Sequence, residues 1–164
     1  MLPAVDTTTK FGLLPEGRHE ASLDEVADLF VSNGPFGSER AVIWQAFLVW
    51  EGLIRRHLPT AVLWINGGFV THKTWAAPSD IDVFVLARPS EINAVGPSAL
   101  LPLLTHRDAA NQRIQPMSGL VDGHIGGRGD AAVITNYHET WRAVTDENKD
   151  EVAGLFKGYV EVKP

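Results

Sequence analysis

Several features are missing from this chain of 164 residues, and each absence excludes a class of protein. The sequence has no cysteine, so it can form neither disulfide bonds nor a thiolate metal site. It has no run of about 18 apolar residues, and its first residues lack the basic and apolar segments of a secretory signal. We therefore expect a cytoplasmic protein that has no membrane partner.

Positive charge is also scarce. The chain carries 14 Lys and Arg against 20 Asp and Glu, which gives a formal net charge of −6. This balance argues against a broad nucleic-acid-binding surface. The length suits one sizeable core and is too short for two ordinary domains, so residues 1–164 are predicted to form one domain. Residues 1–20, with two prolines and two glycines, are expected to be an extended lead-in or a short strand and turn.

Two helices are predicted before the first buried strand. Ser22 and Glu25 have the spacing of a capping box, and apolar residues then recur on one helical face until Asn33-Gly34-Pro35 ends the helix. A second helix is expected from Ser38 to Leu58, where Pro59 stops it.

The later elements are predicted from turn residues and short apolar runs. They are an irregular segment or single helical turn at Arg88–Ala94, a short helix at Pro97–Thr105, a third strand at Leu120–Ile125, a loop at Gly126–Asp130, a helix capped by Asn136 and running through Val144, a polar turn at Thr145–Glu151 and a closing edge strand at Gly158–Val162. Together these elements predict an α/β (α+β) fold, with a small mixed sheet backed by helices on one side.

The most informative part of the sequence is a pair of buried strands in the middle. The first ends at Gly67-Gly68, and the second begins at Asp80-Ile81-Asp82. Side chains at i and i+2 of a strand share a face, so Asp80 and Asp82 would stand roughly 6.5 Å apart at Cα. Two like charges on an otherwise apolar strand repel each other, and a divalent cation would relieve the repulsion. The sequence therefore predicts a metal-dependent phosphate site.

Simpler interpretations of these residues also exist. Asp80 and Asp82 would accept backbone hydrogen bonds if they lay in a solvated turn, and Gly67-Gly68 alone would fit a plain tight turn. Asp122, in the predicted third strand, is either a further ligand or a turn residue. His124 stands two residues later and would share the face of Asp122.

The glycine turn followed by Asp-x-Asp resembles the signature of the polymerase-β-like nucleotidyltransferase superfamily. Further motifs resemble a small, largely uncharacterised bacterial and phage family of nucleotidyltransferase-like proteins. These motifs are Leu14-Pro15-Glu16-Gly17-Arg18-His19, Ala21-Ser22-Leu23-Asp24-Glu25-Val26, Phe69-Val70-Thr71-His72-Lys73, Pro78-Ser79-Asp80-Ile81-Asp82 and Phe156-Lys157-Gly158. They extend over nearly the whole chain, and the resemblance implies a minimal nucleotidyltransferase fold.

The resemblance also implies roles for individual residues. Asp80 and Asp82 would hold the Mg²⁺ or Mn²⁺ ions that bridge the triphosphate of an NTP, and Asp122 would complete the site or activate the acceptor hydroxyl. The amides of Gly67 and Gly68 would approach the phosphates.

Two further residues carry implied roles near the phosphates. Lys73 would neutralise the end of the triphosphate. The serine that the superfamily has after the first glycine is replaced here by Gly68, and Thr71 is the candidate to supply the missing hydroxyl.

The implied reaction moves a nucleoside monophosphate from an NTP to a hydroxyl, with release of pyrophosphate. Because the superfamily includes toxin and antitoxin members, a protein or RNA acceptor is expected rather than a free small molecule. The alternative is a nucleotidyltransferase fold that has lost catalysis and binds a host or partner protein. The replacement of serine by Gly68 is the feature that favours this alternative.

Overall fold

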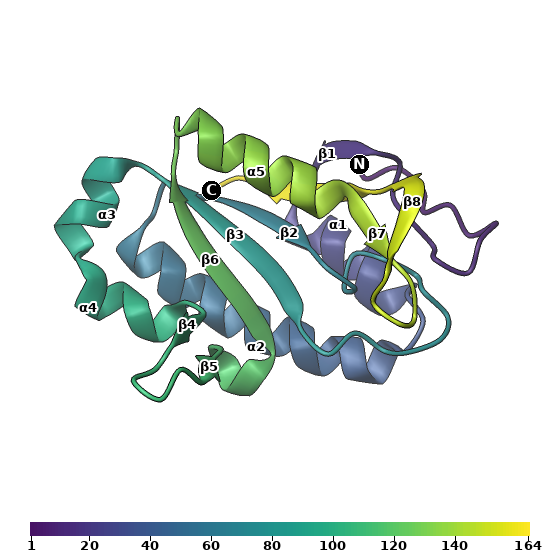
Figure 1. Cartoon of the computed structure of the whole chain (residues 1–164), viewed down its shortest axis with the longest axis horizontal. Coiled ribbons are helices and arrows are strands. Elements are labelled where there is room, and N and C mark those ends of the chain that lie inside the picture. Colours follow the sequence, from purple (N-terminus) through teal and green to yellow (C-terminus); the bar gives the residue numbers. More distant parts are fainter.

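A mixed five-stranded sheet forms the centre of the molecule in the computed structural model, which describes residues 1–164 (Figure 1). The strand order is β1 (Gly17–Glu20), β9 (Gly158–Val162), β2 (Val62–Asn66), β3 (Ile81–Ala87) and β6 (Val121–Gly127). β1 and β9 run parallel, as do β3 and β6, whereas β2 is antiparallel to both of its neighbours. The sheet confirms the predicted mixed α+β fold.

Helices and two small hairpins surround this sheet. The helices are α1 (Leu23–Ala27), which continues into a π-helical turn at Asp28–Ser32, α2 (Gly37–His57), α3 (Pro89–Val95), α4 (Pro97–Leu100) and α5 (Ala131–Arg142). Short 3-10 turns lie between α4 and β6, at Leu101–Leu103 and Met117–Gly119. The hairpins pair β4 (His106–Arg107) with β5 (Arg113–Ile114), and β7 (Ala143–Thr145) with β8 (Glu151–Phe156). None of the helices combines the length and the apolar character that a bilayer crossing requires.

The early helices form where the sequence predicts them. The Ser22 hydroxyl accepts the Glu25 amide at 3.2 Å, and the Glu25 carboxylate accepts the Ser22 amide at 2.9 Å, so the capping box is present. α2 begins one residue before the predicted start and ends one residue before the predicted end. Its buried face includes Phe47, Trp50 and Ile54, which contribute to the main core under the sheet.

The sheet is covered on both faces, so the expectation of helices on one side is wrong. α2 covers the face that carries Ile65 and Val83, and α5 covers the opposite face, where a smaller aromatic cluster forms (Figure 1). This cluster consists of Trp64, Phe84, Leu86 and Tyr159, with Tyr137 and Trp141 of α5 packed against it. α5 and this aromatic cluster lie beside the predicted site, and Trp141 lines the same cavity as Gly67 and Asp82.

α5 begins earlier than predicted. Asp130 is its N-cap and accepts the Val133 amide at 3.1 Å, so Asn136 lies inside the helix rather than at its start. The helix ends at Arg142, and Val144 belongs to β7. Both Asp and Asn are strong caps, and here the aspartate that follows the glycine-rich stretch is the one used.

β6 contains three glycines, and two of them explain why the sequence pattern misplaced the end of this strand. Gly126 and Gly127 were expected in a loop, but they pair with β3. A Cβ atom at Gly126 would lie 2.5 Å from the Phe84 ring, and one at Gly123 would lie 2.9 Å from the Trp50 ring. These glycines therefore make room for aromatic side chains on the two faces of the sheet.

Two other segments also differ from the prediction. Gly158–Val162 is a strand, but it lies inside the sheet between β1 and β2 and is not an edge. Residues 88–94 were expected to be irregular or a single turn, and the segment forms α3, which starts with proline at its first position. Proline is favoured at the first helical position because it has no N–H group, and an N–H at this position would have no partner within the helix.

The loop after Gly68 is anchored by a fully buried arginine. The Arg40 guanidinium, on α2, donates to the carbonyl oxygens of Phe69 at 2.6 Å and Thr71 at 2.5 Å. It also donates to Phe30 and Pro35. Burial lowers the pKa of Arg40 to about 10. Arg40 thereby fixes the start of the β2–β3 connection against the main helix.

Candidate active site

A row of polar side chains crosses the ends of three neighbouring strands. Asn66 of β2 pairs with Asp82 of β3 in the antiparallel ladder, and Asp82 pairs with Asp122 of β6 in the parallel ladder. Residues in register project to the same face, which here is the face covered by α5. Asp80 lies one residue before β3. The structure therefore brings Asp82 and Asp122 together, although 39 residues separate them in the sequence.

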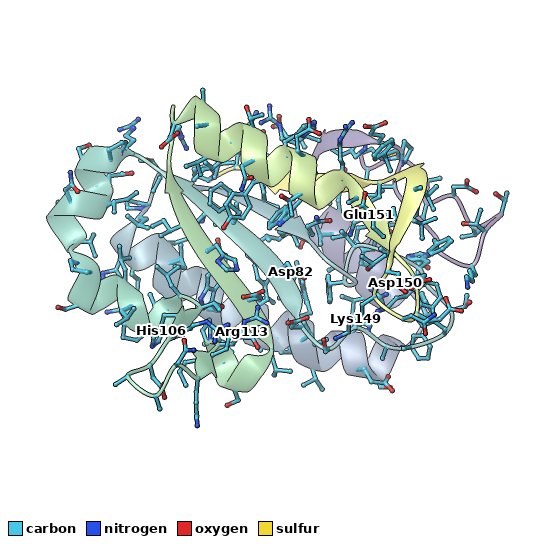
Figure 2. The ribbon with its side chains drawn as sticks, viewed as in Figure 1. Asp82, His106, Arg113, Lys149, Asp150 and Glu151 are labelled. Atoms are coloured by element: carbon cyan, nitrogen blue, oxygen red, sulfur yellow. The ribbon has the colours of Figure 1, made fainter.

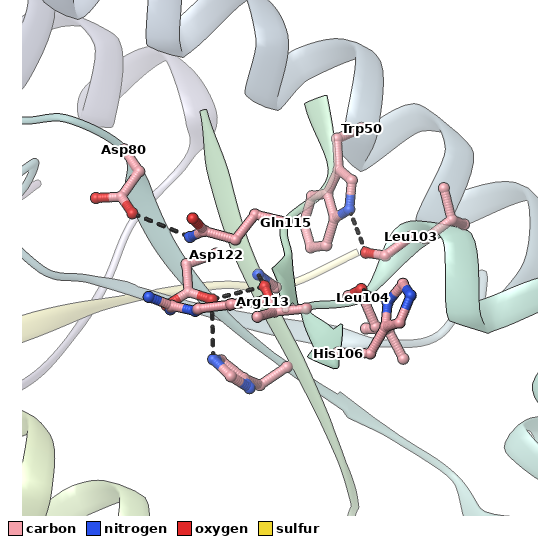
Figure 3. Close-up of polar contacts among 11 residues, drawn as sticks. Trp50, Asp80, Leu103, Leu104, His106, Arg113, Gln115 and Asp122 are labelled. Carbon is pink, nitrogen blue, oxygen red and sulfur yellow. Dashed lines mark hydrogen bonds and ion pairs between the residues drawn. The ribbon is translucent and has the colours of Figure 1, made fainter. Parts of the chain in front are cut away.

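Asp122 is buried, and both of its carboxylate oxygens have partners (Figure 3). Oδ1 accepts the Thr105 hydroxyl at 2.6 Å and lies 3.1 Å from His124 Nε2, and Oδ2 is 2.5 Å from the Arg113 guanidinium. Burial acts to raise the pKa of Asp122, but the hydrogen bonds from His124 and Thr105 and the charge of Arg113 hold it well below its usual range. The surroundings of Asp122 therefore favour its ionised form.

Asp80 and Asp82 differ in their surroundings. Asp80 is partly exposed and accepts Gln115 Nε2 at 3.2 Å (Figure 3). It also accepts the Ser79 hydroxyl at 3.1 Å. Burial raises the pKa of Asp82 to about 6, and the negative charges of Asp80 and Asp122 add to this effect. Asp82 is thus the carboxylate whose ionisation the fold opposes most.

The glycine turn is built around Asp82. Gly67 has a φ of +77°, and a Cβ atom at this position would overlap Asp82 Oδ2. A side chain is therefore excluded at residue 67 by conformation and by space. Gly68 has no such φ, and a Cβ atom there would lie 3.0 Å from the mobile end of Lys73. The glycine at residue 67 is required, whereas a serine at residue 68 requires only that the end of the Lys73 side chain shift by a few tenths of an ångström.

Thr71 and Lys73 lie in the connection that follows the glycine turn. The Thr71 hydroxyl donates to the Gly68 carbonyl at 2.8 Å, so its proton is already engaged within the loop. The Lys73 ammonium lies 5.9 Å from the Trp75 ring centre. Burial lowers the pKa of Lys73, and the nearby Arg40 charge lowers it further.

Lys157 is a site residue that sequence reasoning did not assign. Its ammonium is buried and donates to the Gly67 carbonyl at 2.9 Å. Burial lowers the pKa of Lys157 to about 8, and the negative charge of Asp82 opposes this effect. The sequence gives one indication of this role. A lysine directly before a buried strand carries a charge that needs a partner when it is buried.

A cavity of about 680 Å³ opens beside the glycine turn. Its wall includes Gly67, Gly68 and Asp82, but neither Asp80 nor Asp122. Three lysines, Lys73, Lys149 and Lys157, and three aromatic residues, Phe11, Trp75 and Trp141, also line it. In Figure 2, Asp82 lies between Arg113 of the β4–β5 hairpin and Lys149 of the β7–β8 turn. The cavity thus offers cations for phosphates and flat rings for a base.

Asn66 is the second residue that sequence reasoning missed. It lines the cavity and is 4% exposed. Its Nδ2 donates to the Trp141 carbonyl at 2.9 Å, whereas its Oδ1 is buried and accepts no hydrogen bond. No other buried side-chain polar atom in the structure lacks a partner. In the sequence, Asn66 is one polar residue at the end of an apolar strand, and this pattern does not indicate that its side-chain oxygen lacks a hydrogen-bond donor.

The donor set suits a hard divalent cation in part. Carboxylate oxygens are the ligands that Mg²⁺ and Mn²⁺ prefer, and Asp80 and Asp82 supply them. The structure has no cluster of three or more His, Asp or Glu side chains arranged around one metal position. Since the Asp122 oxygens are engaged by protein groups, this carboxylate would become a ligand only after Arg113 moves away.

Comparison with known proteins identifies a family but no characterised relative. No curated protein matches the chain, and no solved structure matches it. One family model does match, and it covers residues 6–163, which include every site residue described above. The chain belongs to this family, described as a family of unknown function (DUF6932).

Proposed function

We propose that this protein is a metal-dependent nucleotidyltransferase that works in the cytoplasm. It transfers a nucleoside monophosphate from an NTP to a hydroxyl of a protein or RNA acceptor. The acceptor oxygen bonds to the α-phosphorus while the bond from that phosphorus to the pyrophosphate oxygen breaks. The hydroxyl proton leaves to solvent, and pyrophosphate departs. A toxin-like role in bacteria or phages is part of the proposal.

The observation that carries this proposal is the acidic row beside the glycine turn. Asp82 and Asp122 are in-register partners on adjacent strands, and Gly67 packs directly against the Asp82 carboxylate. A carboxylate with a raised pKa, next to a second carboxylate and at the wall of a cavity, is typical of a functional site. A plain tight turn does not require its glycine to contact a half-buried aspartate.

The cavity supports an NTP as the substrate. The Gly68 side of the turn, Lys73 and Lys149 are the groups we propose for the triphosphate, because they provide a backbone approach and positive charge. Trp75 makes an edge contact with Phe11, with ring centroids 5.4 Å apart. We propose that the base stacks in this aromatic part of the cavity.

Asp80 and Asp82 are the proposed ligands of Mg²⁺ or Mn²⁺, which would neutralise charge on the phosphates. Asp122 completes the acidic row. Because its pKa lies well below the usual range, it is a weak base, so we propose that it acts through its fixed negative charge. Lys157 keeps the Gly67 carbonyl in place and balances part of the charge of Asp82.

The test is a labelling experiment with each of the four NTPs, labelled at the α-phosphate or at the γ-phosphate. Pure protein is incubated with a bacterial lysate and Mg²⁺ or Mn²⁺. The proposal expects transfer of the α-label to a macromolecule and no transfer of the γ-label. Asp82→Asn should abolish transfer, and the matched control Asp24→Asn, on the exposed first turn of α1, should not. Absence of α-label on every acceptor would contradict the proposal.

A second candidate function is a catalytically inactive nucleotidyltransferase fold that binds a host or partner protein. The observation that favours it is the saturation of Asp122 by Thr105, His124 and Arg113. A binding module would retain one partner protein in a pull-down without NTP or metal, and Asp82→Asn would not release that partner. An enzyme would instead label its acceptor only when both NTP and metal are present.

A further inference from the structure

The Asn66 side chain is oriented by one hydrogen bond and lacks another. The Trp141 carbonyl is only an acceptor, so the amide must present Nδ2 to it, and this fixes where Oδ1 lies. Oδ1 is then an acceptor without a donor, and it is the only buried side-chain atom in the structure in this state. An unsatisfied buried acceptor is unfavourable, so its presence needs a reason.

The strand register places a second oxygen group next to Asn66. Asp82 is its cross-strand partner, and both residues line the same cavity. No hydrogen bond from a protein donor contributes to the environment of the Asp82 carboxylate. Two neighbouring oxygen groups therefore stand at the cavity wall, and neither has a protein donor.

Asp122 is in the opposite situation. Its two oxygens already receive the Thr105 hydroxyl, the Arg113 guanidinium and a contact from His124. Arg113 lies on β5, outside the main sheet, and supplies the positive charge that a metal would otherwise bring. Asp122 therefore already has hydrogen-bond donors and a positively charged partner, whereas Asn66 Oδ1 and the Asp82 carboxylate have no protein donor.

We infer that Asn66 Oδ1, rather than Asp122, is the third oxygen ligand of the divalent cation that Asp80 and Asp82 hold. This inference rests on the proposed function and names a further residue of the same site. Amide and carboxylate oxygens together are a normal ligand set for a hard cation. A water molecule can donate one proton to each of these two oxygens but leaves the negative charge of Asp82 in place, whereas a cation contacts both oxygens and also neutralises that charge.

The test measures binding of Mn²⁺ alone, by the loss of its free-ion EPR signal, to the full chain without nucleotide. Asn66→Ala should weaken binding by about tenfold or more, whereas Asn66→Asp, which keeps an oxygen and adds charge, should bind at least as tightly as wild type. Asp122→Asn removes a nearby charge but no ligand, so it should weaken binding less than Asn66→Ala does. Asp82→Asn should lose binding.

The two Asn66 variants both lose the hydrogen bond to Trp141, so a purely structural role would affect them alike. Equal Mn²⁺ affinity in wild type and both Asn66 variants, or a loss of affinity in Asp122→Asn as large as in Asp82→Asn, would overturn the inference and leave the proposed function standing. No Mn²⁺ binding by wild type would overturn the metal site of the proposed function and the inference with it. If Asn66→Ala does not fold, Asn66→Asp and Asp122→Asn still decide the question.

Discussion

Neutralising Asp82 should stabilise this protein in the absence of metal. The fold raises the pKa of Asp82 from 3.8 to about 6, because the half-buried carboxylate is desolvated and lies near Asp80 and Asp122. At about 1.4 kcal/mol per pKa unit, ionised Asp82 lowers the free energy of unfolding by at most ~3 kcal/mol. Asp82→Asn removes this cost with almost no change in volume.

The sign of the effect depends on pH. Below the unfolded-state pKa of 3.8, Asp82 is protonated in both states, so the charge contributes nothing. Between 3.8 and about 6 the unfolded chain ionises first, and wild type loses stability relative to the variant as pH rises. Above about 6 the difference is complete.

Urea unfolding with EDTA, from pH 4 to pH 8, measures this difference. The variant should match wild type at pH 4 and exceed it by up to ~3 kcal/mol at pH 8. The control is Asp80→Asn, which keeps the Asp82 carboxyl and removes one repelling charge, so its gain should be smaller. A variant of Asp82 that is less stable than wild type at pH 8 would show that the carboxylate accepts stabilising hydrogen bonds, and the reasoning would be wrong.

Further predictions concern the glycine turn, its anchor and the metal. Gly67→Ala should destabilise by about 3 kcal/mol or more in urea unfolding, because φ is +77° and the new Cβ overlaps Asp82; unchanged stability would contradict the turn geometry. Gly68→Ser should fold normally in the same assay and bind NTP more tightly by calorimetry; failure to fold would show that this position also needs glycine. Arg40→Met should cost about 3 kcal/mol or more, since four carbonyl oxygens lose their donor, and a neutral effect would refute the anchoring role. Mn²⁺ with NTP should raise the Tm of wild type but not of the double variant Asp80→Asn, Asp82→Asn, and equal shifts would place the metal elsewhere.

Local patterns in the sequence were enough for the first half of the fold. The capping box at Ser22 and the helix that Pro59 ends depend on neighbours a few residues away, so the sequence shows them directly. The pairing of Gly67 with a later Asp-x-Asp was also recognisable, because both parts fall on short apolar runs. Asp122 was found because its strand is apolar at the start.

The missed residues depend on contacts between distant segments. Lys157 reaches the Gly67 carbonyl because β9 inserts beside β2, and no local pattern indicates this insertion. Arg113 reaches Asp122 from a hairpin of two-residue strands. Strands of this length are too short to show the alternation of apolar and polar residues that identifies a strand in a sequence. The sequence predicts a loop at Gly126 because the ring that excludes a side chain there, Phe84, belongs to another strand.

The position of β9 inside the sheet has a consequence for how the chain folds. β1 pairs in the main sheet only with β9, and β2 has β9 on one side, so neither ladder can form until residue 162 is available. During synthesis, β2 and β3 would therefore wait with an open, apolar edge, which is a template for intermolecular pairing. Pairing between residues so far apart in the sequence also slows folding. We expect the nascent chain to depend on chaperones until its last strand inserts.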